Sequence, residues 1–352
     1  MIATLLLSLC LSQTGNPAAA SHENPFALNE AIKEFLDKNI DKSADSLQQL
    51  RTLVQLVFRQ NALHFTYQPV TRTAIETFDN HGGNCVSYTF LLIAMARHLG
   101  LNARFREVDI VPIWSEVGSI TSVDGHADVE VRIGPQAYIV DLFPTVYAIQ
   151  LGGRTVPDER AVAHFWNNRG AEQLVANNPR EAIACFRYAL EIDPTAAFVW
   201  VNMGVAETVN EDYEEATLCY QKALHLDKKE SIAMSNLASL YQHMGRLQDA
   251  HRYEEEVKRF NDKNPYYHFN LGLQAYQSGR YRESIGELRS ALKLKSTDHH
   301  FYLAMAKDYA RLGDLEKARQ TIKLALKNAP DDDWKVRYTQ KLDWLAAQLS
   351  EP

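Results

Sequence analysis

The second half of the chain repeats itself with a period of 34 residues, and this period constrains the fold more than any other feature. Five segments follow one another without a gap, at residues 163–196, 197–230, 231–264, 265–298 and 299–332. The eighth position of each segment is small, and the residues there are Gly170, Gly204, Ala238, Gly272 and Ala306. A fixed period of this length is typical of stacked helix pairs, with small residues where the helices cross closely.

This pattern resembles the tetratricopeptide repeat, and the resemblance covers about half of the chain. Gly245, Gly279 and Gly313 mark the turn between the two helices of a repeat. The resemblance implies an all-α solenoid over residues 163–330, which binds a protein or peptide partner in a concave groove lined by the first helix of each repeat. Residues 332–352 are expected to form a capping helix that covers the last repeat.

The sixth position of the repeats carries a ladder of asparagines, at Asn168, Asn202, Asn236 and Asn270, which ends at Ala304. The resemblance implies that this position lines the groove. The fifth position lacks the basic residues with which some such arrays clamp a carboxylate, so a neutral or apolar peptide is favoured. Asparagine is also commonplace at the sixth position, so the ladder has an alternative interpretation in which it says little about binding.

The first half of the chain contains a candidate nucleophile at Cys85. Amphipathic helices are expected at 27–39 and 44–61, followed by the segment His81-Gly-Gly-Asn-Cys85 and an apolar helix that ends at Gly100. Cys85 is therefore expected at a helix N-terminus, where unpaired N–H groups and the helix dipole stabilise a thiolate. The same N–H groups can face a developing oxyanion.

Three strands are expected after this helix. The first is 103–111, and a longer loop with Pro112 and Trp114 follows it. The strands at 126–133 and 137–141 alternate in polarity and are joined by a Gly-Pro turn, which predicts an antiparallel hairpin. In that hairpin His126 and Asp141 project from one face, where the carboxylate can orient the imidazole. Asp128 faces the same way and is an alternative partner for His126.

These three segments resemble the cysteine, histidine and aspartate boxes of the transglutaminase-like superfamily. The boxes are Gly83-Asn84-Cys85, Gly125-His126 and Val140-Asp141, and the resemblance covers residues 53–146. It implies a papain-like α+β fold, with Cys85 as nucleophile, His126 as base and Asp141 as the residue that orients it. The third box is looser than usual, since Pro144 does not directly follow Asp141. We expect this domain at 21–155 and the domain boundary within 147–161, a stretch that contains Gly152, Gly153 and Pro157, and we expect fragments split there to fold separately.

Two functions fit these features. The first is a cysteine acyl transferase or hydrolase that attacks a protein or peptide amide through a Cys85 thioester, while the repeats bind substrate or partner. The second is a non-catalytic interaction scaffold with a transglutaminase-like fold. No metal-ligand spacing or phosphate-binding loop is present in the sequence, so no cofactor is expected. Cys185 and Cys219 occupy the same repeat position and are expected to be buried structural thiols.

Composition and the N-terminus bear on partners and location. The net charge is −7 and no long basic run occurs, so nucleic acid is not an expected partner. Residues 1–20 combine a short apolar stretch with Ala18-Ala19-Ala20, which predicts a cleaved signal peptide, export to the periplasm and no integral membrane segment afterwards. No Lys or Arg precedes the apolar stretch, so a cytoplasmic protein is the alternative, and lipidation at Cys10 is disfavoured.

Overall fold

The computed structural model of the chain describes residues 23–58, 65–110, 114–117, 120–123, 126–141 and 150–350. The chain forms two compact units, one of residues up to 110 with 125–245, and one of 111–124 with 246–352. The expected signal peptide at 1–20, Gly125 and Pro144 lie outside the described residues.

The first unit opens with helices gathered around one apolar helix, α4. Residues 86–96 of α4 are all buried, so this helix is surrounded by protein rather than amphipathic. The Asn29 side chain caps α1 by accepting a hydrogen bond from the Ile32 N–H at 3.0 Å. The elements are α1 (Glu30–Asn39), α2 (Ser46–Phe58), β1 (Thr66–Tyr67), α3 (Ala74–Asp79), β2 (Gly82–Gly83) and α4 (Cys85–His98).

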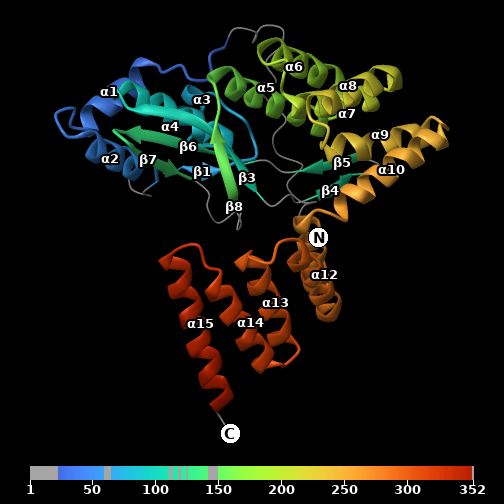
Figure 1. The fold of residues 1–352 in the computed structure, drawn as a ribbon. Helices are drawn as coiled ribbons and strands as arrows, with labels where there is room; N and C mark the ends of the chain where they lie inside the picture. The colour runs from blue at the N-terminus through green and yellow to red at the C-terminus, as the bar shows by residue number, and fades with distance from the viewer. Residues whose placement is uncertain are drawn as a thin grey trace. The chain divides into compact units, whose positions relative to one another are not determined.

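An antiparallel sheet packs against α4, with its strands in the order β7-β6-β3-β8 (Figure 1). The strands are β3 (Asn102–Ile110), β6 (His126–Ile133), β7 (Gln136–Val140) and β8 (Gln150–Thr155). The stretch expected to contain the domain boundary, 147–161, includes β8, whose residues pair with β3. Its glycine is a packing residue: a Cβ on Gly153 would lie 2.6 Å from the guanidinium carbon of Arg106.

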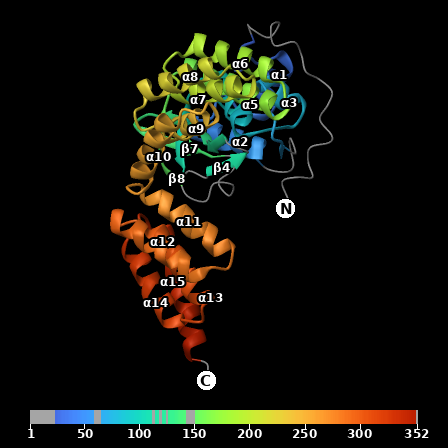
Figure 2. The same ribbon diagram turned by 90° about the vertical axis from the view of Figure 1, so that its right-hand side faces the viewer.

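The first helix pairs of the repeat region belong to this same unit. They lie side by side in Figure 2, and the Gly170 position lets them approach, since a Cβ there would lie 2.5 Å from the Phe186 ring. The first helix begins at Asp158, before the repeat frame at 163. The helices are α5 (Asp158–Val175), α6 (Pro179–Ile192), α7 (Ala197–Val209), α8 (Tyr213–Leu226) and α9 (Ser231–His243).

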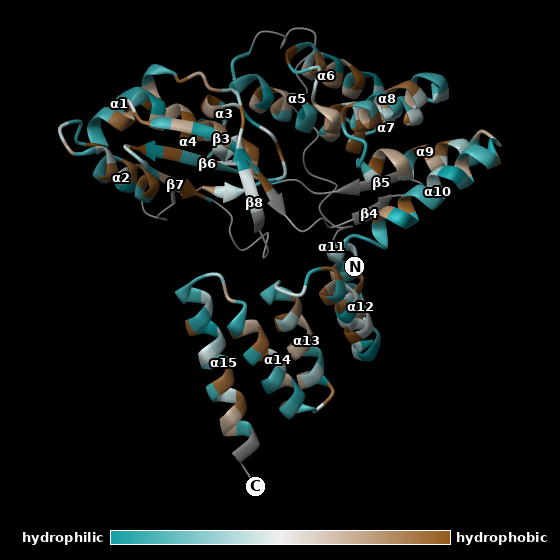
Figure 3. Ribbon diagram, in the orientation of Figure 1, coloured by the Kyte–Doolittle hydropathy of each residue, from teal (hydrophilic) through white to brown (hydrophobic). Residues whose placement is uncertain are grey.

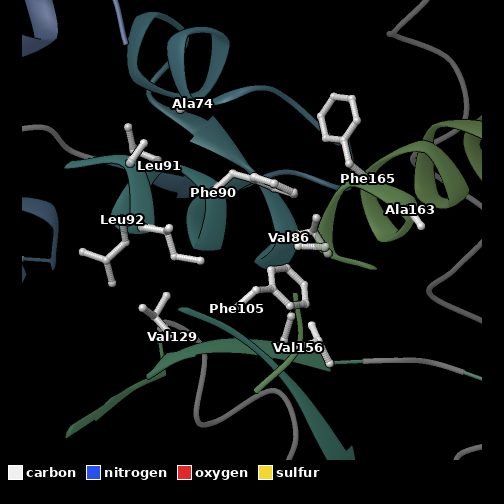
Figure 4. Packing of buried hydrophobic residues seen from close by; sticks show 14 of the residues in the cluster. Ala74, Val86, Phe90, Leu91, Leu92, Phe105, Val129, Val156, Ala163 and Phe165 are labelled. Atoms are coloured by element: carbon white, nitrogen blue, oxygen red, sulfur yellow. The ribbon is translucent and has the colours of Figure 1, made fainter. Parts of the chain in front are cut away.

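Helix α5 shares one hydrophobic core with the sheet and α4. Phe165 of α5 meets Phe90 of α4 edge to face, with the ring centroids 5.7 Å apart, and both rings are fully buried (Figure 4). Phe105 of β3 packs on the other side of Phe90, at 5.9 Å. Cutting before α5 would remove Phe165 from this core, so the shared packing bears on the prediction that the two parts fold separately. That prediction stays to be tested on the separate fragments.

The second unit contains further helix pairs and a hairpin where a loop was expected. Helix α10 is mostly teal in Figure 3 and, among its described residues, buries only Ala250. The hairpin is β4 (Trp114–Val117) with β5 (Ile120–Val123). The helices are α10 (Leu247–Asn261), α11 (Pro265–Gln277), α12 (Tyr281–Leu294), α13 (His299–Arg311), α14 (Leu315–Lys327) and α15 (Asp332–Ser350). None of the described helices has the length and apolar character needed to cross a membrane.

Candidate active site

Cys85 is the first residue of α4, and the residue before it caps the helix. The Asn84 side-chain oxygen accepts a hydrogen bond from the Ser87 N–H at 3.0 Å, which fixes the first turn. The Cys85 side chain is half-buried. Thr89, one turn further, donates to the Cys85 carbonyl at 2.8 Å and lies 3.5 Å from the Ala127 carbonyl of β6. The start of α4 is therefore held against the beginning of β6.

His126 opens β6, and the hairpin register brings Asp141 to it. Val129 pairs with Val140, so continuing the register places Asp141 diagonally across from His126. His126 Nε2 lies 3.1 Å from Asp141 Oδ1, a hydrogen-bond distance. The imidazole is fully buried and the carboxylate nearly so. The prediction that His126 and Asp141 project from one face of the hairpin is thus met by a diagonal contact.

The electrostatics of His126 favour the charged imidazole. Burial lowers its pKa, but hydrogen bonds and charge interactions with Asp141 and Cys85 outweigh burial and raise the pKa of His126 to about 9. Because Nε2 faces Asp141, the other ring nitrogen is the one left for the Cys85 sulfur. The three residues singled out from the sequence are therefore brought together, because His126 interacts with both the Cys85 thiol and the Asp141 carboxylate.

Asp128, the alternative partner for His126, forms an ion pair with Arg106 instead. It is fully buried, and its Oδ2 accepts a hydrogen bond from Arg106 Nη1 at 2.5 Å. Burial raises the pKa of Asp128 to about 6, although the Arg106 guanidinium acts to lower it. Asp141 adds to the rise through like charge. The Asp128–Arg106 pair thus lies beside the histidine without orienting it.

Cys185 and Cys219 are in the interior of repeat helices, as expected. Cys185 is 4% exposed and Cys219 is 1% exposed. Burial raises the pKa of Cys185 to about 11 and that of Cys219 to about 12. Both thiols are therefore structural and protonated at neutral pH.

The four asparagines of the ladder are less exposed than residues that line an open peptide-binding groove would be. Asn236 and Asn270 are buried, while Asn168 and Asn202 are half-buried. Asn202 donates to the Asn167 side-chain oxygen at 2.8 Å, a contact between neighbouring repeats. Packing between repeats therefore accounts for Asn202, and peptide binding by the four asparagines stays a prediction.

Sequence reasoning missed the supports of the site, which come from the segment around Thr71 and from Arg106. The Asn84 side-chain nitrogen donates to Thr71 Oγ1 at 2.7 Å. Part of this segment could have been predicted from the sequence, because Thr73 and Glu76 have the spacing of a capping box. They form that box at the start of α3. Within the described residues, no group of three or more His, Cys, Asp or Glu side chains could hold a metal ion.

Comparison with known families agrees with both halves of the chain. The model of the transglutaminase-like superfamily matches residues 31–141. Models of the tetratricopeptide repeat match 235–299 and 275–336. The middle TPR-like domain of cilia and flagella-associated protein 70 matches 151–261. No curated protein matches the sequence.

Solved structures that resemble the chain include tetratricopeptide proteins. YrrB, described as a TPR protein with an unusual peptide-binding site, is 20% identical, with 51% of this chain and 92% of YrrB covered and a TM-score of 0.27. The pilF protein of Pseudomonas aeruginosa is 20% identical, with 55% and 90% covered and a TM-score of 0.29. A thermophilic TPR protein of Thermus thermophilus is 20% identical, with 51% and 98% covered and a TM-score of 0.27. The family matches confirm the predicted order of modules: the chain carries a transglutaminase-like domain followed by tetratricopeptide repeats.

Proposed function

We propose that the transglutaminase-like domain is a cysteine acyl transferase or hydrolase that acts on a protein or peptide amide. The observation that carries this proposal is the buried His126 imidazole, which interacts with both Asp141 and Cys85. A histidine whose pKa is raised to about 9 is charged at neutral pH, and a charged imidazole stabilises a neighbouring thiolate. This is the ion pair that activates a cysteine nucleophile.

The proposed reaction has two steps. In the first, the Cys85 sulfur bonds to the amide carbonyl carbon, the C–N bond breaks, and the departing amine takes the proton of the His126 imidazolium. In the second, neutral His126 accepts a proton from water or an amine as that nucleophile attacks the thioester, which returns the thiolate and the imidazolium. The Ser87 N–H already serves the Asn84 cap, which leaves the N–H groups of Cys85 and Val86, at the start of α4, to face the developing oxyanion.

The repeats have a binding role in this proposal. Tetratricopeptide repeats generally bind protein partners, and the groove of this array would hold a neutral or apolar segment of the substrate or of a partner protein. Export after cleavage at Ala20 remains our proposal for its location. The rival function, a scaffold without chemistry, becomes the better one if Cys85 proves inert.

The test is covalent trapping in the full chain with peptide chloroacetamides, which present an electrophilic carbon in place of an amide substrate. Mass spectrometry of the digested protein should place the adduct on Cys85. Cys85→Ala should abolish it, whereas the matched variant Cys219→Ala should leave it unchanged. An adduct that is spread over all the thiols, or one that survives His126→Ala at full rate, would support the scaffold instead.

A further inference from the structure

Two neighbouring residues of the first repeat hold the segment that precedes the candidate nucleophile. Glu172 of α5 accepts a hydrogen bond from the Thr71 backbone N–H, with 2.6 Å between nitrogen and Oε1. One helical turn earlier, Arg169 donates to the Glu76 carboxylate at 2.8 Å. Residues three apart lie on the same face of a helix. One face of α5 therefore fixes both Thr71 and the start of α3.

Thr71 in turn holds the residue next to Cys85. Its hydroxyl accepts from the Asn84 side-chain nitrogen at 2.7 Å, while the Asn84 backbone N–H donates to the Val70 carbonyl at 3.1 Å. Thr71 is 1% exposed and Asn84 is 9% exposed, so water has little access to replace these bonds. A continuous chain of contacts thus runs from Glu172 through Thr71 and Asn84 to the first turn of α4.

Helix α5 is itself tightly anchored to the sheet. His164 lies stacked between Phe105 of β3 and Phe198 of α7, with ring centroids 5.5 Å and 4.2 Å away. Its Nε2 is 2.7 Å from the Glu107 carboxylate, which Arg160 also contacts at 2.7 Å. These contacts join the first two repeats to the sheet. Because His164 and Glu172 lie on the same helix, the contacts also fix the position of Glu172.

We propose that Glu172, a residue of the first repeat, is a positioning residue for the Cys85 site and acts through Thr71 and Asn84. This inference rests on the proposed function and adds to it that the repeat region supplies part of the site's architecture as well as a binding surface. Loss of the Glu172 acceptor would leave a buried Thr71 N–H without its partner, and the Asn84 cap would lose its fixed geometry. Cys85 would then spend less time within reach of His126.

Substitutions separate the acceptor from the charge. Glu172→Gln keeps an oxygen that can accept from Thr71, whereas Glu172→Ala removes it. Burial raises the pKa of Glu172 and the Thr71 hydrogen bond lowers it, so a neutral amide is a fair substitute in this setting. Asp158→Ala is the matched control: it breaks the contact of α5 with Arg97 of α4, at 2.7 Å, but does not touch the Thr71 chain.

The experiment measures iodoacetamide labelling of Cys85 in the full chain from pH 5 to pH 9. Glu172→Ala should slow labelling about fivefold at pH 6, because at that pH the Cys85 thiolate depends on the charged His126 imidazole. Near pH 9 the labelling rate should return to the wild-type value. Glu172→Gln and Asp158→Ala should stay within about twofold of wild type throughout. Labelling of Cys185 and Cys219 should not rise, since global loosening would expose them.

Two patterns would overturn the inference. One is equal slowing by Glu172→Ala and Asp158→Ala, which would indicate general loss of packing. The other is a Glu172→Ala rate that matches wild type at pH 6. Amide hydrogen exchange of residues 66–90 keeps this test independent of the proposed function. If wild-type Cys85 is no faster than Cys185, the proposed function fails, and the positioning role is still supported by faster exchange in Glu172→Ala than in Asp158→Ala and refuted by equal exchange.

Discussion

His126 of the first domain and His299 of the fifth repeat are both buried histidines, yet their imidazoles are held in opposite charge states. A carboxylate faces His126, and the pKa of that imidazole is raised to about 9. His299 bonds through Nδ1 to the Tyr338 hydroxyl at 2.6 Å, and burial together with the charge of His300 lowers the pKa of His299 to about 4. Burial alone favours the neutral ring, and a buried acid reverses that preference.

The cysteines of the same two regions differ in a parallel way. Cys85 is half-buried at a helix N-terminus beside a charged imidazole, whereas Cys185 and Cys219 lie inside helices among apolar neighbours. On the proposed function, residue type therefore says little about thiol reactivity in this chain. The position at a helix end and the charge of the neighbouring residue set it instead.

The largest expected effect is a difference in labelling between the cysteines. At pH 6, iodoacetamide should modify Cys85 at least about a hundredfold faster than Cys185 or Cys219, since burial raises the pKa of each repeat thiol by two units or more and each unit reduces thiolate tenfold. Peptide mass spectrometry over time gives the three rates. Similar labelling rates at the three cysteines would contradict the predicted difference between Cys85 and the repeat thiols.

The second prediction concerns His299 in acid. Its folded pKa of about 4 lies below the ordinary 6.5, so the folded state binds fewer protons than the unfolded state and stability falls as the pH drops from 6.5 to 4. This imidazole should account for about 3 kcal/mol of acid sensitivity. Fluorescence of Trp334, whose ring centroid is 4.9 Å from that of His299, reports the unfolding.

His299→Gln should flatten the acid loss while keeping a hydrogen-bonding partner for Tyr338. Comparing this variant with wild type removes the contribution of other titrating groups. An unchanged pH dependence would show that the ring is already charged when folded, and the contrast with His126 would disappear.

The third prediction concerns labelling of Cys85 when the His126 imidazole is removed. Because His126 remains charged up to about pH 9, its imidazolium is available to stabilise a Cys85 thiolate throughout the range from pH 6 to pH 8. His126→Ala should reduce the rate at pH 6 about tenfold and make it rise steeply with pH. Asp141→Asn should give a smaller reduction, of about threefold. A flat profile in His126→Ala would mean that the helix N-terminus alone activates the thiol.

The smallest effect tests why the repeat thiols are slow. Gly204 packs against Tyr220, and a Cβ on Gly204 would lie 2.6 Å from that ring. Gly204→Ala should push the helices apart and speed labelling of the adjacent Cys219 about twofold, with the Cys85 rate unchanged. No change at Cys219 would mean that something other than packing protects it.

Local patterns were sufficient to predict the repeats, α4 and the β6–β7 hairpin. Each depends on residues close in sequence: the 34-residue period, the apolar run after Cys85, and alternation around a Gly-Pro turn. The contact between His126 and Asp141 followed from the register of that one hairpin. Its assembly with Cys85 was suggested by the resemblance and depends on the packing of α4 against β6.

The parts that escaped prediction depend on pairing between distant residues. The Gly152-Gly153 sequence is typical of a linker, and its role as a sheet strand comes from β3, far back in the chain. Likewise, nothing local to Glu172 indicates that its partner is the backbone of Thr71. Long-range partners of this kind leave no mark in periodicity or spacing.

The strand order has a consequence for synthesis of the chain. Cys85 leaves the ribosome before His126, and both precede β8, which must return to pair with β3 before the sheet is complete. Glu172 arrives later still. On the proposed function, Cys85 of a nascent chain is therefore synthesised before the residues that would activate it. The site is assembled stepwise as His126, β8 and the first repeat are added. A chain that stalls before α5 would contain Cys85 without the contact that Glu172 makes with Thr71.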